Sequence, residues 1–213
     1  MADKEILIFV EGPSDKVFLE VYLYFLEDFP IKNFKVKDVK GKDNLSKRLL
    51  EIEKYDKTLI IFDANKDYES NKKEILTVVS KRKQTISEEQ IFLFPNNQDD
   101  GDLETLLLKI AKHDEFLKCF EGYLECIKSK EHYKPIKNIR KNMLYAYLEA
   151  LGLENLTKTN IGVFDDKGKI KSEYEENYKK LTEEAIDFNS KSLIPLKDFL
   201  GQFAENNQKT NLF

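Results

Sequence analysis

Short apolar runs alternate with longer amphipathic stretches along the first half of the chain. The runs at residues 6–10, 34–39, 58–62 and 91–94 have the length and the β-branched or aromatic content of strands. Between them, apolar residues recur at the three- to four-residue spacing of a helix. Because such alternation is typical of successive βα units, it predicts an α/β fold, with a small parallel sheet and helices on both of its faces.

The individual runs also predict where strands lie in the sheet. Residues 58–62 are almost continuously apolar, which is typical of a central strand covered on both faces. Residues 34–39 alternate apolar and charged side chains, as a strand near a sheet edge does. Ser14 is placed to cap the helix after the first strand, and Pro95 is placed to end the fourth strand.

The second half of the chain shows amphipathic helical patterns without further parallel strands. Helices are expected at roughly 114–130, 137–151, 172–186 and 192–204. A small hairpin could form within residues 161–170, and the polar tail at 205–211 is expected to fray. We therefore expect an α/β domain over residues 1–112 and a helical C-terminal extension, residues 113–213, packed on it.

Composition and charge narrow the class of protein. The 213 residues are 35% charged and 41% apolar, so the chain should fold rather than stay disordered. The net charge of −4 means that any nucleic-acid contact needs a local basic patch or a bridging cation. The apolar runs are too short for a signal-peptide core or a membrane span, so we expect no membrane contact and a cytoplasmic location.

The few cysteines and histidines exclude other kinds of site. Cys119 and Cys126 lie seven residues apart in a helical pattern, too far from each other for a disulfide in an intact helix. We expect free, buried, structural thiols, as in a reducing compartment. With only His113 and His132, one chain lacks the material for a multi-histidine metal centre.

Acidic side chains follow two of the predicted strands. Glu11 comes directly after the first strand, and Asp63, Asn65 and Asp67 follow the third. In an open parallel sheet the carboxyl ends of the strands share one edge, where residues distant in sequence can meet on a ligand. Carboxylate oxygens are ligands that Mg²⁺ prefers. We therefore expect Glu11 and Asp63 to face one another and to engage a common ion.

Two motifs at these strand ends resemble those of the toprim domain. Residues 11–15 read EGPSD after the first strand, and residues 63–65 read DAN after the third. The toprim domain is shared by topoisomerases, bacterial primases, some ribonucleases and the overcoming-lysogenization-defect nucleases. Residues 94–97 (FPNN) and 101–104 (GDLE) are similar to those of a narrower family of small toprim-like proteins. The resemblance covers residues 5–112.

The resemblance implies a role for each acidic residue. Glu11 takes the place of the toprim glutamate, which acts as a general acid or base or helps to hold a metal. The Asp-x-Asp pair corresponds to Asp63 and Asn65, so the second position departs from the toprim pattern. An amide oxygen can bind a hard cation but lacks the negative charge that favours Mg²⁺. Asp67 could compensate, or the site could bind metal weakly and lack catalysis.

A second acidic group follows the fourth predicted strand. Asp99, Asp100, Asp102 and Glu104 form this group and could hold a second cation. The alternative is structural, because Asp102 suits a helix cap and Glu104 suits the positive first turn of that helix. The full set of candidate metal ligands is Glu11, Asp63, Asn65, Asp67 and Glu104.

Basic and aromatic side chains could contact a nucleotide or a nucleic acid. Lys40 and Lys42 follow the second strand and could bind a phosphate. The run 81–83 could contact a nucleic-acid backbone, and Tyr145 and Tyr147 could stack on bases. Four more cations lie close together in the sequence: Lys134, Lys137, Arg140 and Lys141. The alternative is a solvated surface for the cations and an apolar core for the tyrosines.

The resemblance and the acidic residues lead to one expected function and two alternatives. The expected function is that of a Mg²⁺- or Mn²⁺-dependent enzyme acting on phosphodiesters, above all a nuclease, with Glu11 as its catalytic residue. The first alternative is a degenerate toprim module that binds a nucleotide, a nucleic acid or a protein without catalysis. The second is an interaction protein whose helical half recruits a partner.

Overall fold

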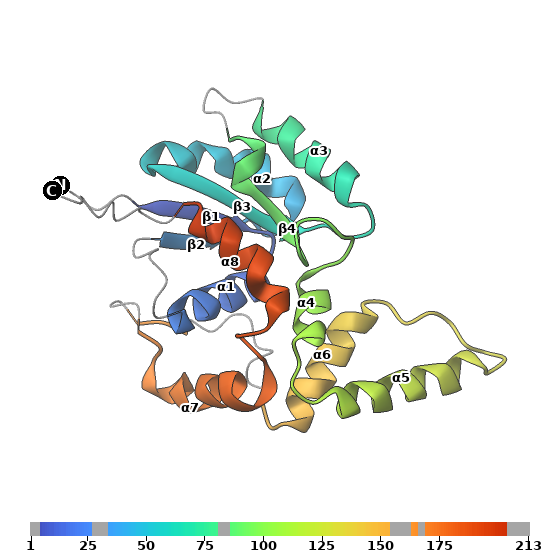
Figure 1. The fold of residues 1–213 in the computed structure, drawn as a ribbon. Coiled ribbons are helices and arrows are strands. Elements are labelled where there is room, and N and C mark those ends of the chain that lie inside the picture. The colour runs from blue at the N-terminus through green and yellow to red at the C-terminus, as the bar shows by residue number, and fades with distance from the viewer. Residues whose placement is uncertain (1–4, 27–33, 81–85, 154–162, 166–168, 204–213) are drawn as a thin grey trace, which may run out of the picture.

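Four parallel strands form the centre of the molecule. The computed structural model describes residues 5–26, 34–80, 86–153, 163–165 and 169–203. The strands are β1 (Ile6–Val10), β2 (Phe34–Asp38), β3 (Lys57–Asp63) and β4 (Ile91–Phe94). They form one sheet in the order β2-β1-β3-β4, with all neighbours parallel (Figure 1). The expected central place of β3 and edge place of β2 are both confirmed.

Helices connect the strands and follow the sheet. The connecting helices are α1 (Pro13–Phe25), α2 (Leu45–Arg48, between 3-10 turns at Lys42–Asn44 and Leu49–Lys54) and α3 (Tyr68–Val79). Helix α4 (Leu103–Lys109) follows the last strand. A further 3-10 turn, Glu88–Gln90, precedes β4. The later helices are α5 (Asp114–Lys128), α6 (Ile139–Ala150), α7 (Ser172–Lys180, continued by a π-helical turn, Leu181–Ala185) and α8 (Ile194–Gly201, after a 3-10 turn, Lys191–Leu193). The predicted α/β fold with a helical C-terminal part is confirmed.

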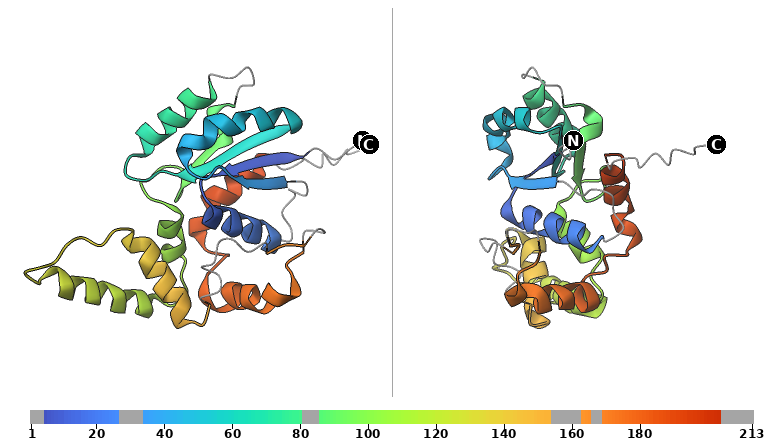
Figure 2. Two further views of the ribbon diagram at one scale, coloured as in Figure 1. Left: turned by 180° about the vertical axis from the view of Figure 1, so that it is seen from behind. Right: turned by 90° about the vertical axis from the view of Figure 1, so that its left-hand side faces the viewer.

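Apolar side chains cover both faces of the sheet. Residues of α1, α4 and α8 belong to the core on one face, with α6 packed on α4, and residues of α2 and α3 belong to the core on the other. The strand order changes direction after β2, so right-handed crossovers require α1 on one face and α2 and α3 on the other. Figure 2 shows this separation from two further sides. The sheet is therefore the middle layer of three.

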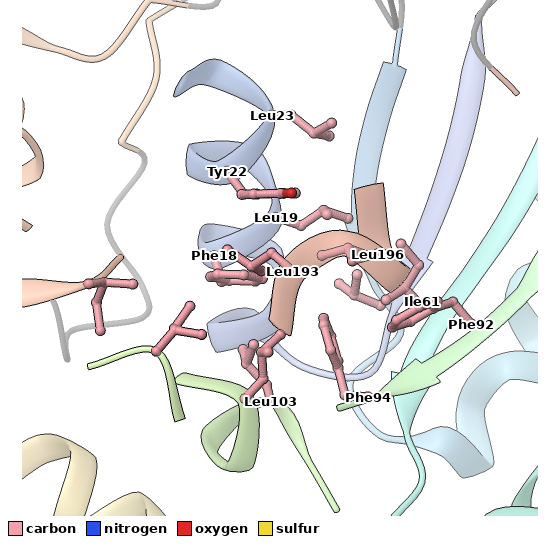
Figure 3. Close-up of a cluster of buried hydrophobic side chains, with 14 of the residues drawn as sticks. Phe18, Leu19, Tyr22, Leu23, Ile61, Phe92, Phe94, Leu103, Leu193 and Leu196 are labelled. Atoms are coloured by element: carbon pink, nitrogen blue, oxygen red, sulfur yellow. The ribbon is translucent and has the colours of Figure 1, made fainter. Parts of the chain in front are cut away.

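Residues of the helical extension join the core of the sheet. Leu196 of α8 belongs to the same buried cluster as Ile61, Phe92 and Phe94 of the strands and Phe18 of α1 (Figure 3). The ring centres of Phe18 and Phe94 lie 6.0 Å apart in an edge-to-face arrangement. Because α8 is far from β4 in sequence, this packing comes from a long-range contact rather than from a local pattern.

Replacing Leu196 by alanine tests whether the two halves unfold together. Leu196 is fully buried, so the change should lower the free energy of unfolding by about 2–5 kcal/mol. Urea unfolding followed by circular dichroism should show one transition with a lower midpoint. The matched control is Leu50→Ala, because Leu50 is 61% exposed and should change stability by less than about 0.5 kcal/mol. Two separate transitions would contradict a shared core.

The start of α1 differs from the prediction. Gly12, not Ser14, is the cap residue, because Pro13 occupies the first helical position and starts the helix earlier. The Asp15 carboxylate accepts a hydrogen bond of 2.7 Å from the Gly12 N–H. The side chain of Asp15 is therefore turned back toward the loop after β1.

Details of the helical half differ from the prediction or fall outside the described residues. Cys119 and Cys126 are free, as expected, but both are exposed rather than buried, because α5 buries none of its residues. Phe164 and Ile170 form one antiparallel bridge where a hairpin was expected. The rest of that hairpin at 161–162 and 166–168, and the tail at 205–211, lie outside the described residues. In the described ranges, no helix is long and apolar enough to cross a membrane.

Candidate functional site

The ends of β1 and β3 meet where the strand order reverses. β1 and β3 are neighbours, while the helices that follow them, α1 and α3, lie on opposite faces of the sheet. Ligands of open α/β sheets bind in the crevice outside such a switch point. Glu11 directly follows β1, and Asp63 ends β3. The fold therefore brings both predicted acids to this position.

A hollow of about 330 Å³ lies at these strand ends. We call it the acidic hollow, and its lining residues are Glu11, Gly12, Pro13, Ser14, Asp15, Gly41, Asp63, Glu104, Lys141 and Tyr145. Four carboxyl groups border this one space: those of the two strand ends, that of Asp15 in the first turn of α1 and that of Glu104 in the first turn of α4. Lys141 of α6 contributes a positive charge to the same lining.

Glu11 has a buried carboxylate oxygen without a partner. Its Oε2 atom is shielded from solvent and makes no hydrogen bond to any described residue. Burial raises the pKa of the Glu11 carboxyl, an effect that the Asp63 N–H and the charge of Lys42 partly oppose. A buried polar atom without a hydrogen bond is costly, so its presence points to a binding or catalytic role.

Asp15 and Asp63 crowd one another beside Glu11. The Leu103 N–H donates a hydrogen bond of 2.9 Å to Asp63 Oδ1. Burial, together with the charges of Asp15 and Glu11, raises the pKa of Asp63 to about 9. Burial, helped by the charge of Glu104, raises the pKa of Asp15 to about 7. Burial and the neighbouring negative charges therefore favour the protonated form of Asp63.

Glu104 and Asp102 have different roles at the start of α4. Glu104 borders the acidic hollow, whereas Asp102 caps the helix and accepts a hydrogen bond of 2.8 Å from the Thr105 N–H. The Arg140 guanidinium of α6 binds the Asp102 carboxylate through Nε and a terminal nitrogen, at 2.6–3.0 Å. Although burial alone would raise it, the hydrogen bonds from Arg140 and Thr105 hold the pKa of Asp102 below its ordinary value. This pair fastens α6 to the start of α4.

Asn65 and Asp67 lie away from the acidic hollow. Asn65 is exposed, has a left-handed backbone with φ of 57°, and exchanges backbone hydrogen bonds of 2.6 and 2.7 Å with Gly101. Asparagine tolerates this conformation better than most residues, which explains its place in the turn. Asp67 is exposed and caps α3, where it accepts a hydrogen bond of 2.9 Å from the Ser70 N–H. The structure therefore does not bring either residue together with Glu11.

The two other acidic residues of the loop after β4, Asp99 and Asp100, accept hydrogen bonds that stabilise the loop and its contact with α3. Asp99 Oδ2 accepts a hydrogen bond of 2.7 Å from the Asn96 side chain. Asp100 Oδ1 accepts one of 2.8 Å from the Tyr68 N–H. Both acids are exposed and neither borders the acidic hollow, so the structure does not group them with the strand-end acids.

The two lysines after β2 have other surroundings. Lys40 is exposed in a left-handed conformation. Lys42 Nζ donates hydrogen bonds to Asn71 Oδ1 and Glu74 Oε2 on α3. Neither lysine borders the acidic hollow, although the charge of Lys42 acts on the Glu11 carboxyl. The two lysines that were predicted to bind a phosphate therefore do not line the acidic hollow.

The remaining basic candidates are distributed over different places. Lys134 and Lys137 are exposed in the segment before α6, while Arg140 is held by Asp102. Residues 81–83 lie outside the described residues. Among the described residues, these cations therefore do not form a continuous basic strip at the acidic hollow.

Helix α6 brings to the site residues that local sequence patterns did not place there. Lys141 and Tyr145 lie one turn apart and both border the hollow, with Lys141 Nζ 5.6 Å from the centre of the Tyr145 ring. Tyr147 is buried instead, and its hydroxyl donates a hydrogen bond of 2.7 Å to the Ala185 carbonyl. Asp15 was also missed as a site residue, and its position in the EGPSD motif was the one available signal.

The four carboxyls are not arranged as a ready-made metal site. No three His, Cys, Asp or Glu side chains of the described residues stand together as metal ligands do. Their chemistry nevertheless fits a cation, because carboxylate oxygens are hard ligands, Glu11 Oε2 lacks a partner, and positive charge would relieve the crowding that raises the pKa of Asp63. Binding would require these side chains to turn toward a common point.

Comparison with known proteins identifies a family for this chain. A family model with the description "Protein of unknown function (DUF3226)" matches residues 5–205. No curated protein and no solved structure matches the chain. The matched range extends from β1 through α8, so it includes the helices that supply Lys141 and Tyr145.

Proposed function

The chain belongs to the DUF3226 family, and we propose that it is a Mg²⁺- or Mn²⁺-dependent enzyme that cleaves phosphodiester bonds of nucleic acids. Two features support a nuclease. The first is the acidic hollow at the switch point of the sheet. The second is the resemblance of residues 11–15 and 63–65 to the toprim motifs.

One observation carries this proposal: a buried Glu11 oxygen that makes no hydrogen bond to the described part of the chain lies in a hollow bordered by three more acids. A cation held by Glu11 and Asp63, with Asp15 or Glu104 beside them, would give that oxygen a partner. When bound, such an ion would neutralise phosphate oxygens and support the leaving oxygen of a phosphodiester. The ligand set is thus revised from the sequence prediction, with Asp15 in place of Asn65 and Asp67.

Residues of the chain itself supply the other functions. Glu11, with its pKa raised by burial, can take up and release a proton closer to neutral pH than an exposed carboxyl can. Lys141 borders the hollow and can bind a phosphate oxygen. Arg140 acts as a positioning residue, because its contact with Asp102 holds α6, and with it Lys141, at the hollow.

A second candidate is a module that binds a nucleotide, a nucleic acid or a protein without catalysis. Two observations favour it: the described residues hold no ready-made set of three ligands, and Asn65 pairs with Gly101 instead of bordering the hollow. In this case the hollow would hold a ligand through Lys141 and Tyr145, and no bond would be cleaved.

Cleavage assays separate the two candidates. The purified protein is incubated with single- and double-stranded DNA and RNA in Mg²⁺, Mn²⁺ or EDTA, and the products are resolved on denaturing gels. Calorimetric titration with Mn²⁺ measures cation binding independently. Cleavage that requires the cation supports the enzyme. Binding of a strand without cleavage in any cation would favour the binding module.

We also infer a cytoplasmic location from the cysteines. Cys119 and Cys126 are free and exposed, and exposed thiols stay reduced only in a reducing compartment. Thiol labelling of protein freshly isolated from cells, followed by mass spectrometry, should find the label on both cysteines.

A further inference from the structure

An apolar cavity shares part of its wall with the acidic hollow. It measures about 90 Å³ and is bordered by residues of α1, α4, α6 and α7. Ser14, Glu104 and Tyr145 line both spaces. Most of the remaining wall is apolar or aromatic and includes Phe18 and Phe188. An apolar space thus lies directly beside a charged one.

We propose that the acidic hollow and this cavity form one site for an unpaired nucleotide. In this arrangement the hollow takes the phosphodiester group, and the cavity takes a single-ring base. The inference rests on the proposed function, because the hollow must bind the phosphate. The additional claim is that the protein recognises a base of the substrate and that this base is unpaired.

The size of the cavity limits its occupant. A cavity of roughly 150 Å³ in a protein core accepts benzene. At about 90 Å³, the cavity beside the hollow has room for much of one six-membered ring and is too small for two fused rings. Because the cavity is not closed to solvent, the ring needs to enter only in part. A pyrimidine therefore fits better than a purine.

The chemistry of the wall favours a flat base over an alkyl chain. Phe18 and Phe188 pack edge-to-face on each other, with ring centres 6.3 Å apart, and both border the cavity, so an aromatic pair forms part of the wall on which a flat ring can pack. The Ser14 hydroxyl and the Glu104 carboxylate stand on the shared wall, where they can pair with the polar edge of a base. Such pairing offsets the cost of burying polar atoms of the base.

The geometry also determines the strandedness. A base that enters the cavity cannot remain paired or stacked in a duplex, so the substrate must be single-stranded or must turn the base out of the helix. Cleavage or binding should therefore favour single strands that contain pyrimidines.

A binding experiment tests the cavity separately from catalysis. Fluorescence anisotropy compares a short strand of abasic nucleotides that carries a single central thymine with a strand of equal length and phosphate number that lacks this base, both in Ca²⁺. The wild-type protein should bind the strand with the thymine about tenfold more tightly, as expected for one buried base. Leu107→Phe fills the cavity and should remove this difference. Leu108→Phe is the matched control, because Leu108 is the next residue of α4, is also partly buried, and lies outside the lining.

Each outcome supports or overturns the base site. Equal affinity of the wild type for both strands would overturn it and leave the proposed cation-dependent function standing. A preference that Leu107→Phe removes, but that persists in EDTA and in Glu11→Gln, would support the base site and contradict the role of the hollow as a cation site. Competition by octyl phosphate and not by thymidine monophosphate would overturn the base site in favour of an alkyl ligand. The wild-type comparison decides even where Leu107→Phe fails to fold.

Discussion

Glu11→Gln is expected to lower the rate of cation-dependent cleavage by about 10²–10⁴-fold, the usual contribution of a general acid or base. The amide keeps the shape of the side chain but can neither take up the proton nor offer the buried Oε2 as a charged ligand. Asp63→Asn should have an effect of similar size, because it removes the second strand-end carboxylate. Single-turnover cleavage of a labelled strand in Mn²⁺ measures the rate, and calorimetry measures Mn²⁺ affinity.

Two further variants test whether a loss of cleavage is specific to the acids of the hollow. Glu89→Gln is the matched control for Glu11→Gln, because Glu89 is exposed in the turn before β4 and outside the acidic hollow, and it should leave the rate unchanged. Asp67→Asn decides between two ligand sets. Asparagine caps a helix about as well as aspartate, so a large loss of activity there would show that Asp67 is a ligand and that the hollow is wrongly assigned. Cleavage that survives both Glu11→Gln and Asp63→Asn would place the activity elsewhere.

Raising the pH is expected to destabilise the cation-free protein. The pKa of Asp63 is raised from 3.8 to about 9 in the folded state, so between these values the folded form binds a proton that the unfolded form has lost. The contribution of Asp63 to the free energy of unfolding is therefore largest below pH 3.8, and it is lost as the pH rises to about 9. Asp15, with its pKa raised to about 7, acts in the same direction over a lower range. Glu11 and Glu104 face both groups and add to the repulsion.

Thermal unfolding in EDTA and in Mn²⁺ measures this effect. In EDTA the Tm should fall by several degrees between about pH 6 and about pH 9, since each kcal/mol corresponds to about 2–4 °C in a chain of this size. If the deprotonated carboxyls bind Mn²⁺ as proposed, the ion should raise the Tm at the higher pH and remove most of the fall. Asp63→Asn should flatten the profile in EDTA. A Tm that rises toward pH 9 without cation would contradict the crowded, protonated state of these acids.

The sheet could be predicted because its signals are local. The four strands are short apolar runs, and Pro95 directly follows the last residue of β4, as predicted. The convergence of Glu11 and Asp63 followed from strand order alone, since parallel strand ends share one edge. These features need no knowledge of distant contacts.

The rest of the site depends on conformations that the pattern does not report. Grouping Asp63, Asn65 and Asp67 assumed that an extended chain continues past β3. The strand ends at Asp63, however, and the left-handed turn at Asn65 sends the later residues elsewhere. Lys141 reaches the hollow through the packing of α6, which includes the Arg140–Asp102 contact between residues distant in sequence. Neither the left-handed turn nor the long-range contact can be predicted from the spacing of apolar residues along the chain.

The position of α8 has a consequence for synthesis on the ribosome. One face of the sheet lacks part of its cover until Leu196, Phe199 and Leu200 have emerged, long after Phe94 at the end of β4. At translation rates of about 5–20 residues per second, the interval lasts on the order of 5–20 s. During that time the nascent chain presents Phe92 and its neighbours to chaperones or to other chains.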